Sequence, residues 1–268
     1  MSNENSLMGN LKSMFAAIVI PVALIVAFII FKFVLGASSN FDAEGHPLEG
    51  NYLAIIHEGG IIVPILIAVN LIVLIFSIER FMTVKKAKGK GRVEAFVRSV
   101  KSMLSNGEID AAIAECDKQE GSIANVIRSG LGKYKHVESD TTMDKEGRSA
   151  AIQKELEEAT SLELPMLSKN LVIISTCASI ATLIGLIGTV LGMIRAFAAL
   201  AQAGSPDATA LATGISEALI NTALGIIGST VAIIMYNYFT TKIDALTYGI
   251  DEAGFSIVQT FNAKHKSN

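Results

Sequence analysis

Four long apolar runs limit this chain to a membrane fold. A membrane-spanning helix needs about 20 consecutive apolar residues, and such runs occupy residues 14–36, 61–79, 170–198 and 211–240. The first run is too long for the core of a signal peptide, and only Lys12 precedes it, so it is predicted to remain as a span. The sequence therefore predicts an all-α integral membrane protein with four transmembrane helices.

The composition agrees with a membrane protein and argues against several other classes. Hydrophobic residues make up 51% of the chain, above the usual share in a soluble domain. The net charge of −3 gives no reason to expect nucleic acid as a partner. The sequence has no phosphate-binding loop, no Cys/His metal spacing and no nucleophile motif, so we predict neither an enzyme nor a cofactor or metal site. Cys116 and Cys177 are expected to be free thiols, because one lies in a charged stretch and the other in an apolar run.

The basic residues set the expected orientation, because Lys and Arg concentrate in cytoplasmic loops. Most of the 22 Lys and Arg residues lie between Arg80 and Lys169, whereas residues 37–60 contain none and are acidic. The loop 37–60 and the linker 199–210 are therefore predicted to be periplasmic. The cytoplasmic parts are then the lead 1–13, the region 80–169 and the tail 241–268, which places both termini inside.

The cytoplasmic region carries apolar stripes of its own, spaced for helices. Several stripes fall within residues 93–131, and the polar stretch 132–147 is predicted to be a loop. A charged amphipathic helix is predicted over 149–163, before Pro165, which can start or kink a helix. In the tail, the apolar stripe continues at Ile243, Leu246, Ile250, Ile257 and Phe261. Long cytoplasmic helical extensions are therefore expected.

The last two apolar runs carry matched stripes of small and hydroxyl residues. The first stripe is Ala178, Thr182, Gly185, Thr189, Gly192 and Ala196, and the second is Gly214, Ala218, Thr222, Gly225, Ser229 and Ala232. Spacings of three and four residues place each set on one helix face. Small residues let two helices approach closely in a membrane. One hairpin does not supply all the neighbours that these stripes need, so a homo-oligomeric ring is expected.

Two charged residues lie near the outer ends of these runs. Glu217 is inside the fourth run, where an ionisable group is a functional candidate by default; the alternative is a structural partner of a cation. Arg195 is six residues outward of Thr189 and Glu217 is five residues outward of Thr222, offsets of about 9 and 7.5 Å. An ion pair between Arg195 and Glu217 is therefore predicted, although Arg195 can instead extend to the membrane surface.

The same segments resemble a known family. The stretch Gly185–Met193, GLIGTVLGM, resembles the GLxGTVxGM signature of ExbB and TolQ. The stretch Glu217–Gly225, EALINTALG, followed by Tyr236-Asn237, resembles their EALxxTAxG…YN signature. Glu79-Arg80 is similar to the Glu-Arg pair that the family has at its first span. The chain is identified as a member of the MotA/TolQ/ExbB proton channel superfamily and is most similar to ExbB.

The resemblance implies a subunit of a proton-driven motor in the inner membrane of a Gram-negative bacterium, surrounded by lipid. Such subunits are expected to form a ring, a pentamer, around single-span ExbD or TolR partners whose membrane aspartate carries the proton, and to work with TonB in outer-membrane transport. Carried over by position, Thr189, Thr222 and Glu217 belong to the proton path, with Thr182 and Ser229 extending the pore lining. The helix-packing glycines are Gly185, Gly188, Gly192 and Gly225.

The chain departs from the family at Thr182 and Val231, where proline is usual, and in its additional span 14–36. A TolQ-like subunit that maintains the cell envelope, a MotA-like flagellar stator and a self-contained channel or carrier remain as alternatives. The Glu217–Gly225 motif with Tyr236-Asn237 favours ExbB and TolQ over MotA. The sequence offers no second carboxylate in these runs and no broken helix, which weighs against a carrier.

Overall fold

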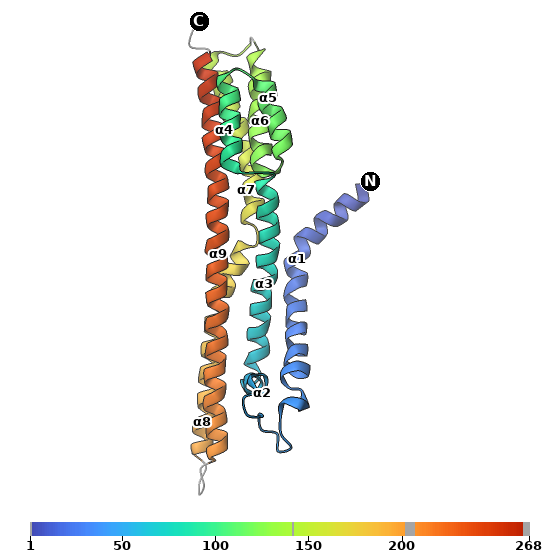
Figure 1. The fold of residues 1–268 in the computed structure, drawn as a ribbon, viewed down its shortest axis with the longest axis vertical. Helices are drawn as coiled ribbons and strands as arrows, with labels where there is room; N and C mark the ends of the chain where they lie inside the picture. The colour runs from blue at the N-terminus through green and yellow to red at the C-terminus, as the bar shows by residue number, and fades with distance from the viewer. Residues whose placement is uncertain (1, 141, 202–206, 265–268) are drawn as a thin grey trace. The chain divides into compact units, whose positions relative to one another are not determined.

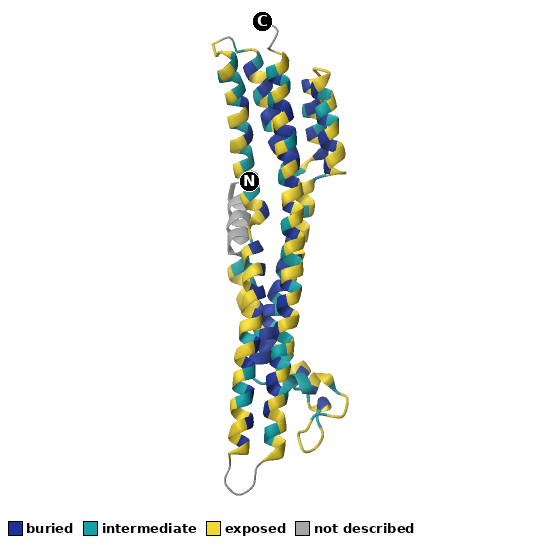
Figure 2. Cartoon of the chain, turned by 90° about the vertical axis from the view of Figure 1, so that its left-hand side faces the viewer, coloured by how far each residue is buried: buried dark blue, intermediate teal, exposed yellow. Residues whose placement is uncertain are grey.

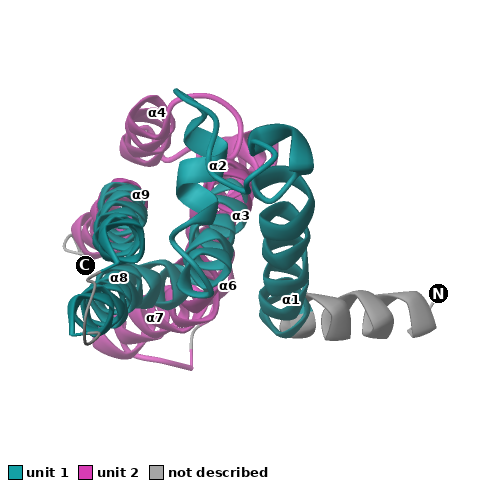
Figure 3. Ribbon diagram, turned by 90° about the horizontal axis from the view of Figure 1, so that it is seen from below, with its two compact units in different colours: residues 1–78, 170–236 teal, residues 79–169, 237–268 magenta. Residues whose placement is uncertain are grey.

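The computed structural model describes residues 2–140, 142–201 and 207–264, with side chains from Phe15 onward, and nearly all of these residues are helical (Figure 1). The helices are α1 (Ser2–Ile29), α2 (Tyr52–His57), α3 (Ile62–Lys88), α4 (Val93–Ser105), α5 (Ile109–Gln119), α6 (Gly121–Glu138), α7 (Lys145–Ser168), α8 (Leu171–Leu200) and α9 (Ala208–Lys264). The chain divides into unit 1, residues 1–78 and 170–236, and unit 2, residues 79–169 and 237–268 (Figure 3).

Unit 1 contains α1, α8 and the first parts of α3 and α9. Among the described residues, four helical segments are long and apolar enough to cross a membrane, in agreement with the four predicted spans. Their outward side chains are large, apolar and exposed, as at Leu183, Leu186, Val190 and Phe197 of α8, and exposed residues run along these helices in Figure 2. An exposed apolar surface of this extent marks a contact with another apolar phase, here lipid. The chain is a multi-pass membrane protein.

The segment between α1 and α3 is folded rather than extended. A π-helical turn, Ile30–Leu35, ends the first span. The Asn40 Nδ2 donates to the Val34 and Leu35 carbonyls at 2.7 and 3.0 Å. The His57 ring stacks on Phe31 with 4.5 Å between ring centroids. At the other end of the span, Phe15 contacts Phe76 of α3, with the ring centroids 5.5 Å apart. The additional helix is therefore held against α3 at one end and against its own loop at the other.

Unit 2 contains α4 to α7, the end of α3 and the end of α9. The apolar stripes that the sequence predicts in 93–131 are buried except at Ile113, which is half-buried. The five predicted tail positions are also buried: Ile243, Leu246, Ile250, Ile257 and Phe261. Phe261 contacts Tyr134 of α6 edge to face, with centroids 5.1 Å apart. Burial of these side chains stabilises the unit, because each large apolar side chain removed from water contributes about 1.5–3 kcal/mol.

Two local predictions differ from the structure. Residues 132–147 were expected to form a loop, but α6 continues to Glu138 and α7 begins at Lys145. The reason is that Tyr134 and Val137, both buried, extend the apolar face of α6 by two turns within an otherwise polar stretch. Pro165 does not start a new helix but lies inside α7, which ends three residues later at Ser168.

Candidate functional site

The contact between α8 and the first part of α9 depends on glycines that the sequence analysis singled out for packing. A Cβ atom added to Gly192 would lie 2.6 Å from the Ala218 nitrogen, and one added to Gly225 would lie 2.7 Å from the Ala181 oxygen. These are backbone atoms, which have no room to move aside. Gly185 similarly faces the Asn221 carbonyl oxygen at 2.9 Å. The two backbones touch at several levels, so each stripe does face the partner helix.

Gly188 has a different neighbour from the other packing glycines. A Cβ atom there would overlap the side chain of Asn221, including its Nδ2 at 2.8 Å. Asn221 is fully buried, and its Nδ2 donates to the Gly59 carbonyl at 2.9 Å. Asn221 was not among the predicted site residues. The available signal was an amide at the position four residues after Glu217, on the same face of the helix.

The hydroxyl groups of Thr189 and Thr222 meet between the two helices. Their Oγ1 atoms are in hydrogen-bond contact, and either one can be the donor. Each hydroxyl also lies 3.1 Å from the carbonyl oxygen four residues earlier in its own helix, at Gly185 and Ala218. Both threonines are partly buried. The structure therefore brings these two predicted site residues together. The Thr189 hydroxyl has three acceptors within reach: the Gly185 and Ala218 carbonyls and the Thr222 hydroxyl.

Arg195 and Glu217 are also brought together. The Arg195 Nη1 donates to both carboxylate oxygens of Glu217, at 2.7 and 2.6 Å. The Glu217 side chain is only 3% exposed, whereas that of Arg195 is 58% exposed. The Gly59-Gly60 turn before α3 covers the carboxylate, since a Cβ atom at Gly60 would lie 2.7 Å from Glu217 Oε1. The carboxylate is thus enclosed by α8, α9 and this turn.

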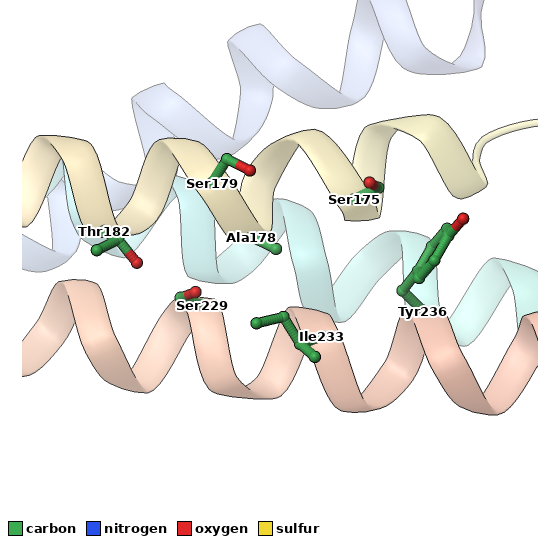
Figure 4. A pocket seen from close by; sticks show the side chains of 7 residues that line it. All are labelled: Ser175, Ala178, Ser179, Thr182, Ser229, Ile233 and Tyr236. Atoms are coloured by element: carbon green, nitrogen blue, oxygen red, sulfur yellow. The ribbon is translucent and has the colours of Figure 1, made fainter.

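Thr182 and Ser229 line a pocket between α8 and α9 with a volume of about 330 Å³. Figure 4 shows both side chains pointing into the space between the two helices, while the ring of Tyr236 extends from α9 toward α8. The complete lining is Ser175, Ala178, Ser179, Thr182, Ser229, Ile233 and Tyr236. Ser175, Ser179 and Tyr236 were not predicted as site residues. No three His, Cys, Asp or Glu residues within 2–140, 142–201 and 207–264 are grouped to hold a metal ion.

Glu79 and Arg80, the pair quoted for the resemblance, belong to unit 2. Arg80 is 2% exposed, and its Nε donates to Glu79 Oε2 at 2.6 Å. Its Nη1 donates to the Leu167 carbonyl at the end of α7, at 2.9 Å. The Arg80 guanidinium therefore binds a carboxylate of its own helix, α3, and a terminal carbonyl of α7. These hydrogen bonds hold the end of α7 against α3.

Comparison with known proteins gives a family match and several relatives. The MotA/TolQ/ExbB proton channel family matches residues 118–252. The biopolymer transport protein ExbB of Pseudomonas putida is 27% identical over 146 residues, which cover 54% of this chain and 44% of that protein. The Tol-Pal system protein TolQ of Pseudomonas aeruginosa is 28% identical over 127 residues, 47% of this chain and 55% of that protein.

A third relative aligns over more of the chain than these two. A putative ExbB homologue of Methanothermobacter thermautotrophicus is 25% identical over 195 residues, 73% of this chain and 65% of that protein. This chain therefore spans about half to two thirds of the length of these relatives. The family match covers α8 and the part of α9 that carries Thr222 and Glu217.

Proposed function

Because this chain belongs to the MotA/TolQ/ExbB proton channel family, we propose that it is an ExbB-like motor subunit of a Gram-negative inner membrane. It uses the proton motive force, together with ExbD-like and TonB-like partners, to energise transport at the outer membrane. In this role it is not an enzyme and needs no cofactor. The observation that carries the proposal is the contact between the Thr189 and Thr222 hydroxyls inside the family's two signature segments.

A proton carrier from outside the chain is part of this proposal. The stripes on α8 and α9 present hydroxyls, and the described part of both helices within the spans contains one carboxylate, Glu217. Glu217 is about 140° around α9 from Thr222, at about 100° per residue, and its oxygens are bound by Arg195. A group that titrates next to the two threonines must then come from another helix. A membrane aspartate on a single-span partner meets this requirement.

A ring of identical subunits, a pentamer, would place that partner at its centre. The small-residue faces of α8 and α9 pack against each other over only part of their length, because the groove lined by Thr182 and Ser229 stays open. Helices that carry small residues and hydroxyls associate through close packing and hydrogen bonds. We place Thr189, Thr222, Thr182 and Ser229 on the pore side, where they face the partner helices.

A TolQ-like role in envelope maintenance is the second candidate. It is favoured by the similarity to TolQ proteins such as that of Pseudomonas aeruginosa. A MotA-like stator has less support, since the Glu217–Gly225 motif with Tyr236-Asn237 is closer to ExbB and TolQ. Deletion of the gene separates the two candidates: loss of energised uptake fits ExbB, and leakage of periplasmic proteins fits TolQ.

The oligomer and its partner provide the direct test. Purification in mild detergent is expected to yield a homo-oligomer, a pentamer, with a small single-span protein bound, and native mass spectrometry measures both. After reconstitution into vesicles, the complex is expected to conduct protons, whereas the ring without its partner is not. A chain that stays monomeric with the partner present, or that conducts protons alone, would contradict the motor and favour a self-contained channel.

The orientation is tested by labelling single cysteines from the periplasmic side. With 37–60 and 199–210 periplasmic and 80–169 cytoplasmic, a cysteine placed at Ser39 is expected to react and one at Ser139 is not. Ser205 is a second periplasmic position, although it lies outside the described residues. Both termini are then cytoplasmic. Labelling at Ser139 from outside intact cells would overturn this topology.

A further inference from the structure

The loop after the additional span contains α2, and hydrogen bonds fix the beginning of this short helix to the end of the span (Figure 1). Asn51 Oδ1 accepts from two backbone N–H groups in the first turn of α2, and Asn51 Nδ2 donates to Asn40 Oδ1 at 3.1 Å. Asn40 is bound in turn to the last carbonyls of the π-helical turn that ends the span. Ala54, in the middle of α2, is fully buried. The start of α2 therefore has a defined position relative to the first span.

An aromatic clamp, formed by Phe31 and Phe41, holds the end of α2. The last residue of this helix is His57, whose ring stacks on Phe31 with 18° between the ring planes. Phe41 packs edge to face against the same ring, with centroids 5.5 Å apart. Both geometries are favoured for aromatic rings. Gly36 leaves the room that the ring needs, because a Cβ atom there would lie 2.7 Å from His57 Nε2. The residues around His57 thus come from the end of the additional span and the loop that follows it.

The Gly59-Gly60 turn is bonded to the end of α2. The Gly60 nitrogen donates to the His57 carbonyl, and the Gly59 nitrogen donates to the Ile56 carbonyl, each at 3.1 Å. In the chain, only Glu58 separates His57 from this turn. A change in the position of His57 is therefore transmitted to the Gly59-Gly60 turn.

This turn lies directly on the Arg195–Glu217 pair. A Cβ atom at Gly60 would be 2.7 Å from Glu217 Oε1 and 3.4 Å from Arg195 Nη1. Gly60 also has a φ of +72°, which L side chains rarely adopt, so the close approach depends on glycine. Asn221, one turn along α9 from Glu217, donates to the Gly59 carbonyl at 2.9 Å. Because the Arg195 side chain is itself 58% exposed, the enclosure of the carboxylate depends on the turn.

We propose that His57 is a positioning residue for the Arg195–Glu217 pair, and that the additional span 14–36 serves to hold it in place. The end of the span and its loop fix α2, α2 fixes the Gly59-Gly60 turn, and the turn excludes water from the Glu217 carboxylate. An ion pair is stronger where water is excluded. The inference rests on the proposed function, because it gives the additional span a part in the motor: it keeps a charged group of the proton path closed on the side of the loop 37–60.

Carboxyl labelling tests the enclosure without any measurement of activity. The assembled complex of the full chain is treated with a water-soluble carbodiimide and glycine ethyl ester, which convert accessible carboxyl groups to amides, and mass spectrometry measures the labelled fraction. Glu44, an exposed carboxylate of the same loop, is the internal reference. Glu217 is expected to react roughly tenfold more slowly than Glu44, because a buried group reacts only when the structure opens locally. Equal rates would overturn the proposal.

Variants of the clamp test the role of His57. Phe31→Ala removes the ring that stacks on His57, and His57→Ala removes the histidine ring, so each is expected to increase the labelling of Glu217 severalfold. Phe33→Ala is the matched control, since it removes the same kind of side chain two residues further on at a position that is 67% exposed. His46→Ala removes an exposed histidine of the same loop. Both controls are expected to leave the labelling unchanged.

Two more variants separate positioning from a general loss of stability. Phe31→Tyr keeps the stacked ring and is expected to keep Glu217 protected. Asn221→Ala leaves the clamp intact and removes the hydrogen bond to the Gly59 carbonyl, so it is expected to increase the labelling and decides the question if a clamp variant does not assemble. A purely structural role of His57 predicts a lower unfolding temperature with unchanged labelling. That result, or equal labelling in Phe31→Ala and Phe33→Ala, would overturn the proposal.

Proton flux through the reconstituted complex separates this inference from the proposed function. Phe31→Ala and His57→Ala are expected to lower the flux severalfold, because Glu217 is no longer held in its place, whereas Phe33→Ala is expected to leave it unchanged. A native complex that conducts no protons refutes the proposed function whatever the labelling shows. A conducting complex in which Phe31→Ala labels and conducts like Phe33→Ala refutes the role of His57 alone.

Discussion

Replacing either Thr189 or Thr222 with valine is expected to reduce proton-driven transport to the level of a strain that lacks the gene. Valine keeps the shape of threonine and removes the hydroxyl, so the close contact between α8 and α9 remains. The cost in stability is small, about 1 kcal/mol, because each hydroxyl exchanges its hydrogen bonds mainly with its own helix. The loss in function is large, because a proton cannot be passed to or from an apolar surface. Uptake in cells and proton flux in vesicles measure this, with the amount of assembled ring as the reference.

Matched substitutions separate a polar role from a packing role. Thr189→Ser and Thr222→Ser keep the hydroxyl, remove a methyl group and are expected to retain most of the transport. Thr176→Val removes an exposed hydroxyl of α8 that is bound to its own helix, and it is expected to have no effect. Normal transport by both valine variants would mean that the two threonines are packing elements, and the pore assignment would then be wrong.

The features that sequence predicts well here are those that depend on local spacing. Spans follow from apolar length, and helix faces follow from the repeat of three and four residues. The depth of a residue in a membrane helix follows from its position, because each residue adds about 1.5 Å. For this reason the Arg195–Glu217 contact was predictable, once Thr189 and Thr222 were taken to lie at the same depth in the hairpin.

Features that depend on contacts between distant segments were missed. Asn221 donates to Gly59, 162 positions away, and no periodic pattern connects the two. The turn at Gly59-Gly60 was expected to be part of a simple loop, yet it covers Glu217. Tyr134 and Val137 extend α6 because both side chains are buried in the apolar core of unit 2. The polar residues on either side of them in the sequence made this apolar pattern difficult to recognise. Tyr236 lies in a motif that the resemblance supplied, but its place in the groove required the pairing of α8 with α9.

The Arg195–Glu217 pair leads to a prediction about stability in which the two partners are unequal. Arg195→Ala leaves Glu217, 3% exposed, as an unpaired charge beneath the Gly59-Gly60 turn. Removing one partner of a fully buried pair costs about 3–5 kcal/mol, which is an upper bound for this variant. Glu217→Ala is expected to cost clearly less, because the Arg195 side chain is already 58% exposed and can turn toward water or lipid headgroups. Thermal unfolding of the assembled ring measures both.

The double variant shows whether the two residues act as a pair. If they do, Arg195→Ala with Glu217→Ala is expected to be milder than the sum of the two single changes, since no buried charge is left behind. Glu217→Gln keeps the size of the side chain and removes its charge. In the Glu217→Gln background, Arg195→Ala is therefore expected to lower the stability less than it does in the native chain. Equal costs for the two single changes, or strict additivity in the double variant, would show that the ion pair does not govern stability. Glu217 would then be available for a direct part in the proton path, and Arg195 would act as an anchor at the membrane surface.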